Sequence, residues 1–307
     1  MREPIEKKKK MKTSAGDKAL SIVTYVIYTI FAFVCVYPFY YIFINTISAN
    51  NLSERGKILF WPQQIHFSNY IAVLKIPGLT NALKVSVERT VVGTVITVFI
   101  AAFLGFMFTQ NTMWKRKFWY RFVVATMYFN AGIIPWYITM RNLGLTNNFW
   151  GYILPVAVSP FYIVLCKTFV ESIPKELQDA AEIDGAGTLT VFGKIILPII
   201  KPILATVAIF TAVNQWNAFQ DTLLLVTDDK LYTLQYTLYQ YINQASSLKS
   251  LANNGSSSQM AASLAHAQTA TSIRMTVTIV VVAPILCIYP IFQRFFVKGI
   301  MIGAVKG

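Results

Sequence analysis

Residues 90–114 read TVVGTVITVFIAAFLGFMFTQNTMW, without a single Asp, Glu, Lys or Arg. About 18 or more consecutive apolar residues are enough to cross the hydrocarbon layer as an α-helix. The strands of a membrane barrel would alternate apolar and polar side chains, and Val91–Ala102 does not alternate. The stretch therefore predicts a transmembrane helix.

Similar charge-free runs lie on both sides of it: Ala19–Ser53, Phe122–Met140, Asn142–Cys166, Pro202–Gln220 and Met275–Gln293. With 55% apolar and only 13% charged residues, the chain falls outside the composition of water-soluble domains. The first run is too long for a signal-peptide core, and no A-x-A-like cleavage signal follows it. We predict an all-α integral membrane protein with six transmembrane helices, at about Leu20–Thr46, Asn81–Gln110, Phe122–Met140, Phe149–Val170, Pro202–Val226 and Ile273–Phe296.

The formal charge of +14 comes from basic residues clustered in connecting segments rather than along one face, which argues against a nucleic-acid partner. Most of the 27 Lys and Arg residues fall on one side if the N-terminus is inside. The positive-inside rule then predicts cytoplasmic N- and C-termini in a bacterial plasma membrane. The expected divisions are a basic N-terminus (1–18) and a transmembrane domain (19–307) with a cytoplasmic segment (171–201), an outside loop (227–272) and a tail (297–307). Within the loop, Ser246–Ser263 is polar and aperiodic, which predicts a mobile insert.

No cofactor site is recognisable in the sequence. Cys35, Cys166 and Cys287 lie far apart without C-x-x-C spacing, and His66 and His266 have no ligand cluster around them, so no metal is expected. There is no phosphate-binding Gly loop with Lys and Ser or Thr. The chain is therefore expected to be non-catalytic and to bind no cofactor itself.

One connecting segment does not look like a simple linker: DAAEIDGAGTLTVFGKIILPIIKP, Asp179–Pro202. Acidic residues from Glu176 onward suit the first turns of a short helix. Gly185 and Gly187 allow a sharp reversal. A second amphipathic stretch, with apolar side chains at helical spacing, is expected to end at Leu197-Pro198 because proline lacks the N–H of a helical hydrogen bond. Two short helices under the membrane are predicted; a re-entry turn without function is the alternative.

The order Asp179-Ala180-Ala181, Gly185, Ile195-x-Leu197-Pro198 resembles the cytoplasmic loop signature of permease subunits in bacterial ABC importers. The resemblance covers nearly the whole chain and is closest to the maltose-type carbohydrate branch, among Gram-positive oligosaccharide permeases. It is carried by MYFNAGIIPWYITMRNLGLTNNFW (127–150), SIPKELQDAAEIDGAG (172–187), NQWNAFQD (214–221) and FFVKGIMIGAVKG (295–307). Asp179 stands where this family usually has Glu, so the carboxylate is one methylene shorter.

This resemblance implies a type I importer permease fold, in which the loop helix docks in a groove of a cytoplasmic ATPase. The implied partners are a second related permease, two ATPase subunits that use ATP and Mg, and an extracellular binding protein that delivers an oligosaccharide. The tail would reach between the ATPase subunits. The implied coupling residues are Asp179, Ala180, Ala181, Glu182, Asp184, Gly185, Phe192, Leu197 and Pro198.

Polar residues within a span are expensive in lipid and usually face a cavity or another helix. Asn214, Asn217 and Asp221 fall at i, i+3 and i+7, which would place them on one face of the fifth span, with Trp216 and Gln220 nearby. They are the candidate substrate pathway, with Asn130 and Trp136 as weaker candidates; a polar packing contact between helices is the alternative. Arg89 and Arg274 are expected to reach the membrane interface.

Two other classes of membrane protein would show different features in the sequence. An ion-coupled secondary sugar transporter should show inverted repeats and acidic residues at mid-membrane depth, and neither is evident. A membrane-bound enzyme would need a His, Cys or carboxylate cluster at one membrane face. Only the acidic cytoplasmic segment approaches that.

Overall fold

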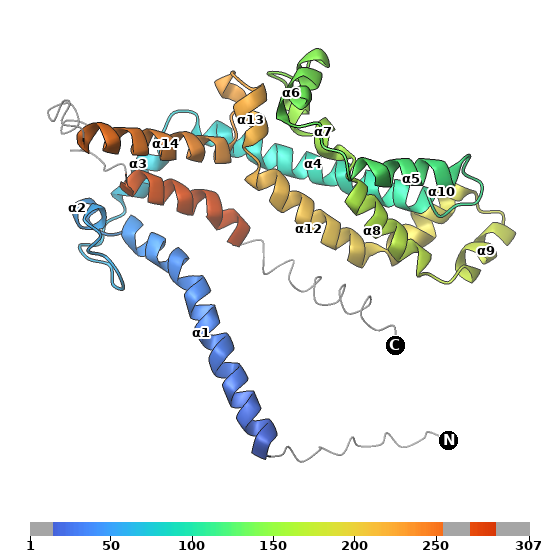
Figure 1. The fold of residues 1–307 in the computed structure, drawn as a ribbon, viewed down its shortest axis with the longest axis horizontal. Coiled ribbons are helices and arrows are strands. Elements are labelled where there is room, and N and C mark those ends of the chain that lie inside the picture. Colours follow the sequence, from blue (N-terminus) through green and yellow to red (C-terminus); the bar gives the residue numbers. More distant parts are fainter. Residues whose placement is uncertain (1–14, 254–270, 287–307) are drawn as a thin grey trace.

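Helices form all of the regular structure in residues 15–253 and 271–286, the part of the chain that the computed structural model describes (Figure 1). In chain order they are α1 (Ala15–Thr46), α2 (Asn50–Glu54), α3 (Ser68–Leu74), α4 (Leu79–Met107), α5 (Arg116–Thr126), α6 (Ile133–Asn142), η1 (Phe149–Tyr152), α7 (Leu154–Ala157), α8 (Pro160–Glu171), α9 (Glu176–Ile183), α10 (Thr188–Thr190), the π-helix η2 (Val191–Ile196), α11 (Leu197–Ile199), α12 (Lys201–Asn217), α13 (Gln220–Leu225), η3 (Asp229–Leu231) and α14 (Leu234–Asn253). A further helix covers Thr271–Leu286. The predicted helical architecture is confirmed; the tail 297–307 and the end of the sixth predicted span lie outside the described residues.

Two helices are long and apolar enough to cross a membrane, Gly16–Thr46 and Leu79–Met107. Two bent pairs also meet that test when each is taken together: Phe149–Ala157 with Pro160–Glu171, bent by 47°, and Thr188–Ile199 with Lys201–Asn217, bent by 79°. Length and composition thus support two to four spans in the described residues. The count of six remains a prediction.

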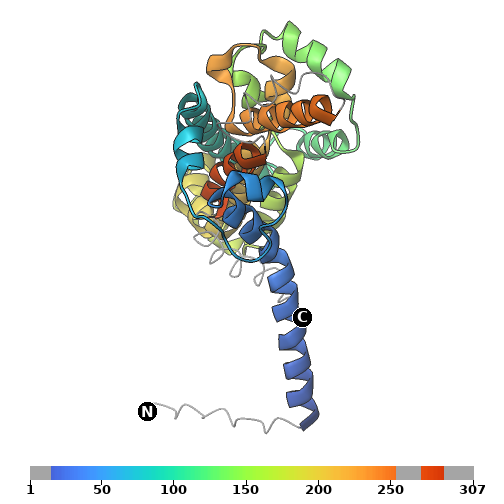
Figure 2. The same cartoon turned by 90° about the vertical axis from the view of Figure 1, so that its left-hand side faces the viewer.

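Helix α1 stands apart from the other helices. In both views it projects away from the body of the molecule, and none of its apolar window is buried (Figures 1 and 2). Tyr37 and Tyr40 near its C-terminal end donate hydrogen bonds to the carbonyls of Leu59 and Phe60, which tie it to the following loop. A helix that is apolar on all sides requires lipid or another protein around it.

Helix α4 is the central element, because α8, α12 and α14 all pack along it. Its glycines permit the close crossings. A Cβ on Gly105 would lie 2.8 Å from Cys166 Cβ and 2.9 Å from the backbone nitrogen of Lys167 in α8. Small residues at such crossings let backbones approach closely, as is common in membrane helices.

The third predicted span, Phe122–Met140, is wrong as a single helix. Helix α5 ends at Thr126 and α6 begins at Ile133. Pro135 explains the break, because its ring would clash with the carbonyl of Ala131 in a continuous helix. Gly132 adopts a φ of +85° at the restart. Pro155 and Pro160, each in the first turn of a new helix, similarly divide the fourth span.

The fifth predicted span, Pro202–Val226, is also interrupted. Helix α12 ends at Asn217, the backbone of Ala218 is extended, and α13 restarts at Gln220. The carbonyl of Ala218 accepts a hydrogen bond from Arg89 Nη1 at 3.2 Å instead of one from a helical N–H. The idea that Asn214, Asn217 and Asp221 share one helical face is therefore wrong.

The predicted loop 227–272 is not irregular in its first half. Helix α14 extends to Asn253, so the proposed insert 246–263 begins within a helix, and its residues 254–263 lie outside the described part. Leu234 and Leu238 of α14 pack with Trp216 and Val277 in one apolar cluster. This packing, which local sequence composition does not reveal, gives the helix a buried face.

Candidate functional site

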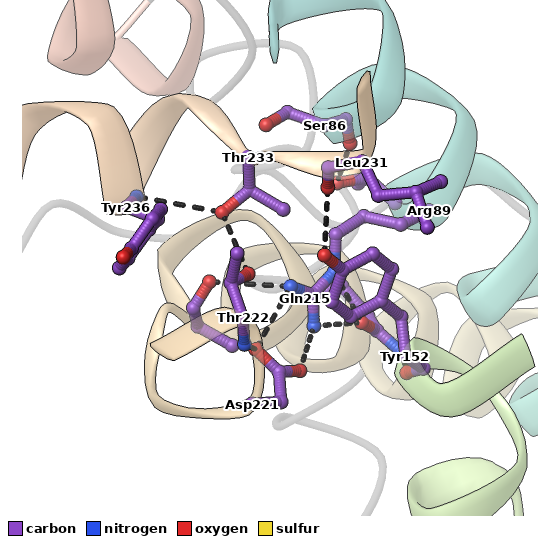
Figure 3. Close-up of polar contacts among 11 residues, drawn as sticks. Ser86, Arg89, Tyr152, Gln215, Asp221, Thr222, Leu231, Thr233 and Tyr236 are labelled. Carbon is purple, nitrogen blue, oxygen red and sulfur yellow. Dashed lines mark hydrogen bonds and ion pairs between the residues drawn. The ribbon is translucent and has the colours of Figure 1, made fainter. Parts of the chain in front are cut away.

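A buried arginine organises the polar centre of the molecule. Arg89, on α4, is only 1% exposed and forms an ion pair with Asp221 on α13, with 2.6 Å between Nη2 and Oδ2 and 3.2 Å between Nη1 and Oδ1 (Figure 3). Its Nε and Nη2 donate to Gln215 Oε1 at 3.1 and 3.0 Å, and its Nη1 also donates to the Ala218 carbonyl. All five N–H groups of the guanidinium are thereby used within the chain.

Tyr152 and Gln215 hold the guanidinium in place. The Arg89 guanidinium carbon lies 4.5 Å from the centroid of the Tyr152 ring, a cation–π arrangement. The Tyr152 hydroxyl donates to the Leu231 carbonyl at 2.7 Å, and Gln215 Nε2 donates to the Tyr152 carbonyl at 3.4 Å (Figure 3). The cluster thus joins α4, η1, α12 and α13.

Gly93 makes room for Gln215. A Cβ at Gly93 would lie 2.4 Å from Gln215 Nε2, so any larger residue would displace the amide that accepts from Arg89. Gly93 is one helical turn beyond Arg89 on α4. The arginine and the glycine therefore function as a pair: one supplies the donors and the other the space for their acceptor.

Hydroxyl contacts extend this polar centre toward α14. Thr222 and Thr233 hydroxyls lie 3.1 Å apart, and the backbone N–H of Leu234 donates to Ser86 Oγ at 2.8 Å. Both contacts are buried; the first joins residues 11 positions apart and the second joins residues 148 positions apart (Figure 3). They fix the end of the interrupted helix against α4.

A cavity of about 430 Å³ opens beside the arginine cluster. Its walls come from α4, the turn between α7 and α8, and α12, and it is lined by Arg89, Thr97, Pro155, Val156, Val158, Ser159, Pro160, Tyr162, Thr211, Asn214, Gln215, Ala218 and Asp221. Thr97 and Thr211 are 1% and 5% exposed, and neither hydroxyl has a hydrogen-bond partner among the described residues. Both hydroxyl oxygens are themselves fully buried, so neither is open to the cavity.

The predicted pathway residues separate into two groups. Asn214 and Asp221 line the cavity, and Asn214 Nδ2 donates to the Tyr162 hydroxyl at 3.3 Å. The remaining five do not line it: Trp216, Asn217, Gln220, Asn130 and Trp136.

Four of these five have contacts of other kinds. Trp216 is buried, and its indole N–H donates to the Val281 carbonyl. Asn217 Oδ1 accepts from Gln235 of α14, Asn130 Oδ1 accepts from Gly132, and Trp136 packs against an apolar cluster. Their contacts are those of helix packing and turns.

The interfacial position expected for Arg89 is wrong. Its partner Asp221 is 132 residues away, so no local pattern connects them. A signal was nevertheless present: Arg89 directly precedes a charge-free run, and Asp221 directly follows one. One cation and one anion bordering apolar segments are candidates for a buried pair.

The segment between α8 and α12 forms the second candidate site. Helix α9 ends in a Schellman turn, in which Ala186 N–H donates to the Ala181 carbonyl at 2.9 Å and Gly185 N–H donates to the Glu182 carbonyl at 3.0 Å. Gly185 has a φ of +82°, the left-handed conformation that this turn requires. Gly187 has an ordinary φ of −70°. The predicted reversal therefore depends on Gly185 alone.

The second helix of this segment continues further than expected. Residues Val191–Ile196 form a π-helical turn, and the Leu197 N–H donates to the Phe192 carbonyl, five residues back. A widened turn accommodates Pro198, which has no N–H to donate, so the helix continues to Ile199 before the 79° bend into α12. The predicted end at Leu197-Pro198 is therefore wrong.

Apolar side chains anchor this segment to the end of α4. The Phe192 ring lies 5.3 Å from that of Phe106 and 5.5 Å from that of Phe103, between ring centroids. Phe192 is buried, and Leu197 and Ala181 pack against the same cluster. Gln110 Nε2 also donates to Gln178 Oε1 of α9 at 3.1 Å. Phe192 and Leu197 therefore lie on the side of the segment that packs against α4 and hold it there.

The other face of the segment is exposed. Asp179, Ala180, Glu182, Asp184 and Gly185 lie on it, as does Pro198. Two large apolar side chains are exposed beside them, Ile183 at 86% and Leu189 at 69%. Large exposed apolar side chains on a projecting loop are a feature of protein-docking surfaces.

Comparison with known proteins identifies the class. Residues 10–302 match the family model described as the binding-protein-dependent transport system inner membrane component. The chain belongs to this family of membrane components of ABC importers.

Among curated relatives, protein LplC of Bacillus subtilis is 34% identical, over 89% of this chain and 90% of that protein. The polygalacturonan/rhamnogalacturonan transport system permease protein YtcP of Bacillus subtilis is 29% identical, over 95% of this chain and 99% of its own length. A solved structure of a bacterial ABC transporter involved in the import of the acidic polysaccharide alginate superimposes with a TM-score of 0.80 at 28% identity, covering 93% of this chain and 99% of that chain. The predicted resemblance to carbohydrate importer permeases is confirmed.

Proposed function

We propose that this chain is the permease subunit of an ATP-driven importer that takes up oligosaccharides delivered by an extracellular binding protein. The observation that carries the proposal is the cavity beside Arg89 and Asp221, an open space lined by polar and apolar side chains of α4, α8 and α12. Such a space suits a hydroxyl-rich solute, because polar groups in a span face a cavity or a partner.

The names of relatives support a sugar as the cargo. Besides YtcP, they include an arabinooligosaccharides transport system permease protein of Halalkalibacterium halodurans and a melibiose/raffinose/stachyose import permease protein of Bacillus subtilis. These proteins are 27% and 24% identical to this chain over at least 90% of its length. An oligosaccharide is the cargo class that these names share.

The exposed face of α9 is the proposed docking surface for the ATPase. Asp179, Ala180, Glu182, Asp184 and Gly185 would contact its groove, with Ile183 and Leu189 adding apolar area. The complex would contain two ATPase subunits, which bind ATP and Mg, and a second, related permease. Helix α1 is apolar and long enough to cross a membrane, and its surface would lie in the bilayer or against that second permease.

The proposed orientation places α9 on the cytoplasmic side and η3 with α14 outside. This agrees with the picture, in which α9 and α14 lie at opposite ends of α4 (Figure 1). Six spans are proposed, with both termini inside a bacterial plasma membrane.

Two helices connect the docking surface to the cavity. Helix α4 contacts Phe192 through Phe106 and carries Arg89 about 26 Å further along, at 1.5 Å per residue. Helix α12 begins directly after the docking segment and carries Asn214 and Gln215. A shift of the docked segment would therefore reach the cavity through packed helices.

Uptake measurements test this proposal. Bacteria lacking this chain are expected to lose uptake of labelled oligosaccharide and to regain it when the chain is restored. Uptake should stop when ATP is depleted and persist when the ion gradients are collapsed. Uptake that follows the ion gradient instead would indicate the secondary transporter.

A further inference from the structure

We infer that the start of α5 binds the headgroups of anionic phospholipids at the membrane surface. The residues concerned are exposed and either basic or aromatic: Trp114, Lys115, Lys117, Phe118, Arg121 and Phe122, together called the α5 patch. This inference goes beyond the proposed uptake of sugar and uses only the proposed orientation, in which this end of the molecule is cytoplasmic.

The α5 patch lies at the same end of α4 as the proposed docking surface for the ATPase. Figure 1 shows α5 and α10 together at this end. Gln110, in the turn that leads from α4 to α5, donates from Nε2 to Gln178 Oε1 of α9 at 3.1 Å. A lipid bound to the patch would therefore lie at the membrane surface that faces the ATPase.

Helix α5 has one packed side and one exposed side. Arg116 and Tyr120, one helical turn apart, face the rest of the molecule: Arg116 Nη1 donates to the Thr109 carbonyl, and Tyr120 is only partly exposed. Phe118 and Phe122 project from the opposite side at 100° per residue and are 58% and 54% exposed. The patch is therefore free of contacts that would keep its rings from lipid.

The cations of the α5 patch have no acidic partner among the residues that the structure describes. Residues 89–170 contain no Asp or Glu. Glu171, which follows this range, pairs with Lys167 Nζ at 2.6 Å. The three basic side chains of the patch belong to none of the ion pairs in the described ranges. Their charge is left for a partner from outside the chain.

The charge at the start of α5 is opposite to what a helix favours. Lys115 is the N-cap residue, Arg116 and Lys117 follow it, and the first turn contains no acidic residue. The N-terminal end of a helix carries a partial positive charge, so cations there are unfavourable and anions are favourable. A phosphate beside these residues would offset the repulsion.

Rings and cations on one exposed surface fit the boundary of a bilayer. Exposed Lys and Arg are costly in hydrocarbon, and a cluster of large exposed rings is unusual in water. Trp is enriched at the membrane interface, and basic residues there attract anionic headgroups. The charge-free run 122–140 begins at the patch, so the bilayer is already next to it. An anionic phospholipid supplies phosphate for the cations and acyl chains for the rings.

Charge-neutral variants test the inference without disturbing the fold. The three cations of the α5 patch are replaced together, as Lys115→Gln, Lys117→Gln and Arg121→Gln. The matched control removes three exposed cations outside the patch, as Arg55→Gln, Lys57→Gln and Lys75→Gln. All six side chains are exposed, so both variants should unfold at the wild-type temperature in detergent without added lipid.

Native mass spectrometry counts the lipids that the purified importer complex retains from an equimolar mixture of phosphatidylglycerol and phosphatidylcholine. The wild type should retain phosphatidylglycerol preferentially. The α5 patch variant should bind it at least about 10-fold more weakly, on the order of 5-fold for each cation before screening by salt. The control variant should match the wild type.

Four results would overturn the inference. They are equal retention of the two lipids by the wild type, unchanged retention of phosphatidylglycerol by the α5 patch variant, an equal loss in the control variant, and loss of the copurifying ATPase from the α5 patch variant with lipid retention unchanged. The last result would assign the patch to the ATPase instead. Lipid retention is measured without cargo or ATP, so a failure of the proposed uptake activity would produce none of these results.

Discussion

Arg89 and Asp221 are 132 positions apart in sequence and form a two-pronged ion pair at 2.6 and 3.2 Å. The pair spans the gap at Ala218 where α12 stops, and so holds α13 against α4. The arginine is almost fully buried, while the Asp221 side chain is 16% exposed, so removing the pair leaves a buried donor or acceptor without its charged partner. The stability of this end of the molecule should therefore depend on the pair.

Arg89→Ala is expected to destabilise the folded chain by about 3–5 kcal/mol, because it leaves Asp221 and the Gln215 and Ala218 carbonyls without their donor. Lys84→Ala is the matched control on the same helix, since Lys84 pairs with Glu88 at 3.8 Å on an exposed face and its loss should cost no more than about 1 kcal/mol. Thermal unfolding in one detergent compares the two variants. Equal shifts in midpoint would show that the buried pair adds nothing.

Gly93→Ala should weaken the same cluster without touching a charge. The added Cβ would displace Gln215, whose Oε1 accepts two hydrogen bonds from Arg89, at an expected cost of roughly 1–3 kcal/mol. Gly193→Ala is the control, because nothing lies within 4 Å of the position of its Cβ and alanine favours helix. If the two variants unfold at the same temperature, Gly93 is not required for spacing.

Gly185→Val should separate the permease from its ATPase. A β-branched residue is strained at a φ of +82°, whereas asparagine tolerates the left-handed region. Gly185→Val should therefore reduce the ATPase that copurifies per permease several-fold, and Gly185→Asn should retain most of it. Gly187→Ala is the control, with its ordinary φ and open surroundings. Full ATPase recovery with Gly185→Val would show that this turn is not part of the joint.

Cysteine labelling tests the orientation. In a cysteine-free background, Asp229→Cys in η3 should react with an impermeant maleimide on intact cells stripped of their wall. Leu189→Cys, 69% exposed at the other end of the molecule, should react only after the membrane is opened. The reverse pattern would invert the proposed topology.

The apolar runs predicted much of this fold, since a chain in lipid must satisfy its backbone hydrogen bonds within helices. The reversal at Gly185 was predictable for a local reason: glycine suits the left-handed turn that ends α9. The break at Ala218 was not predictable from local sequence, because the donor to the Ala218 carbonyl is Arg89, 129 residues away. A prediction from helical periodicity assumes that the helix is continuous. It therefore placed Asn217 and Asp221 on one helical face, although α12 ends at Asn217.

The threonines of the cavity were missed for a related reason. Thr97 and Thr211 sit in apolar helices, where threonine usually donates to its own backbone as Thr206 does. In the structure neither hydroxyl has a hydrogen-bond partner among the described residues, which the sequence alone does not indicate.

The central claim is that this chain couples ATP hydrolysis to oligosaccharide import, and one measurement addresses it most directly. The chain is purified through a tag from bacteria, placed in nanodiscs with everything that copurifies, and assayed for ATP hydrolysis with and without sugar-loaded binding protein. The complex should contain an ATPase and a second permease, and sugar-loaded binding protein should raise hydrolysis several-fold. A chain that purifies without any ATPase, while its oligosaccharide uptake follows the ion gradient, would contradict the account.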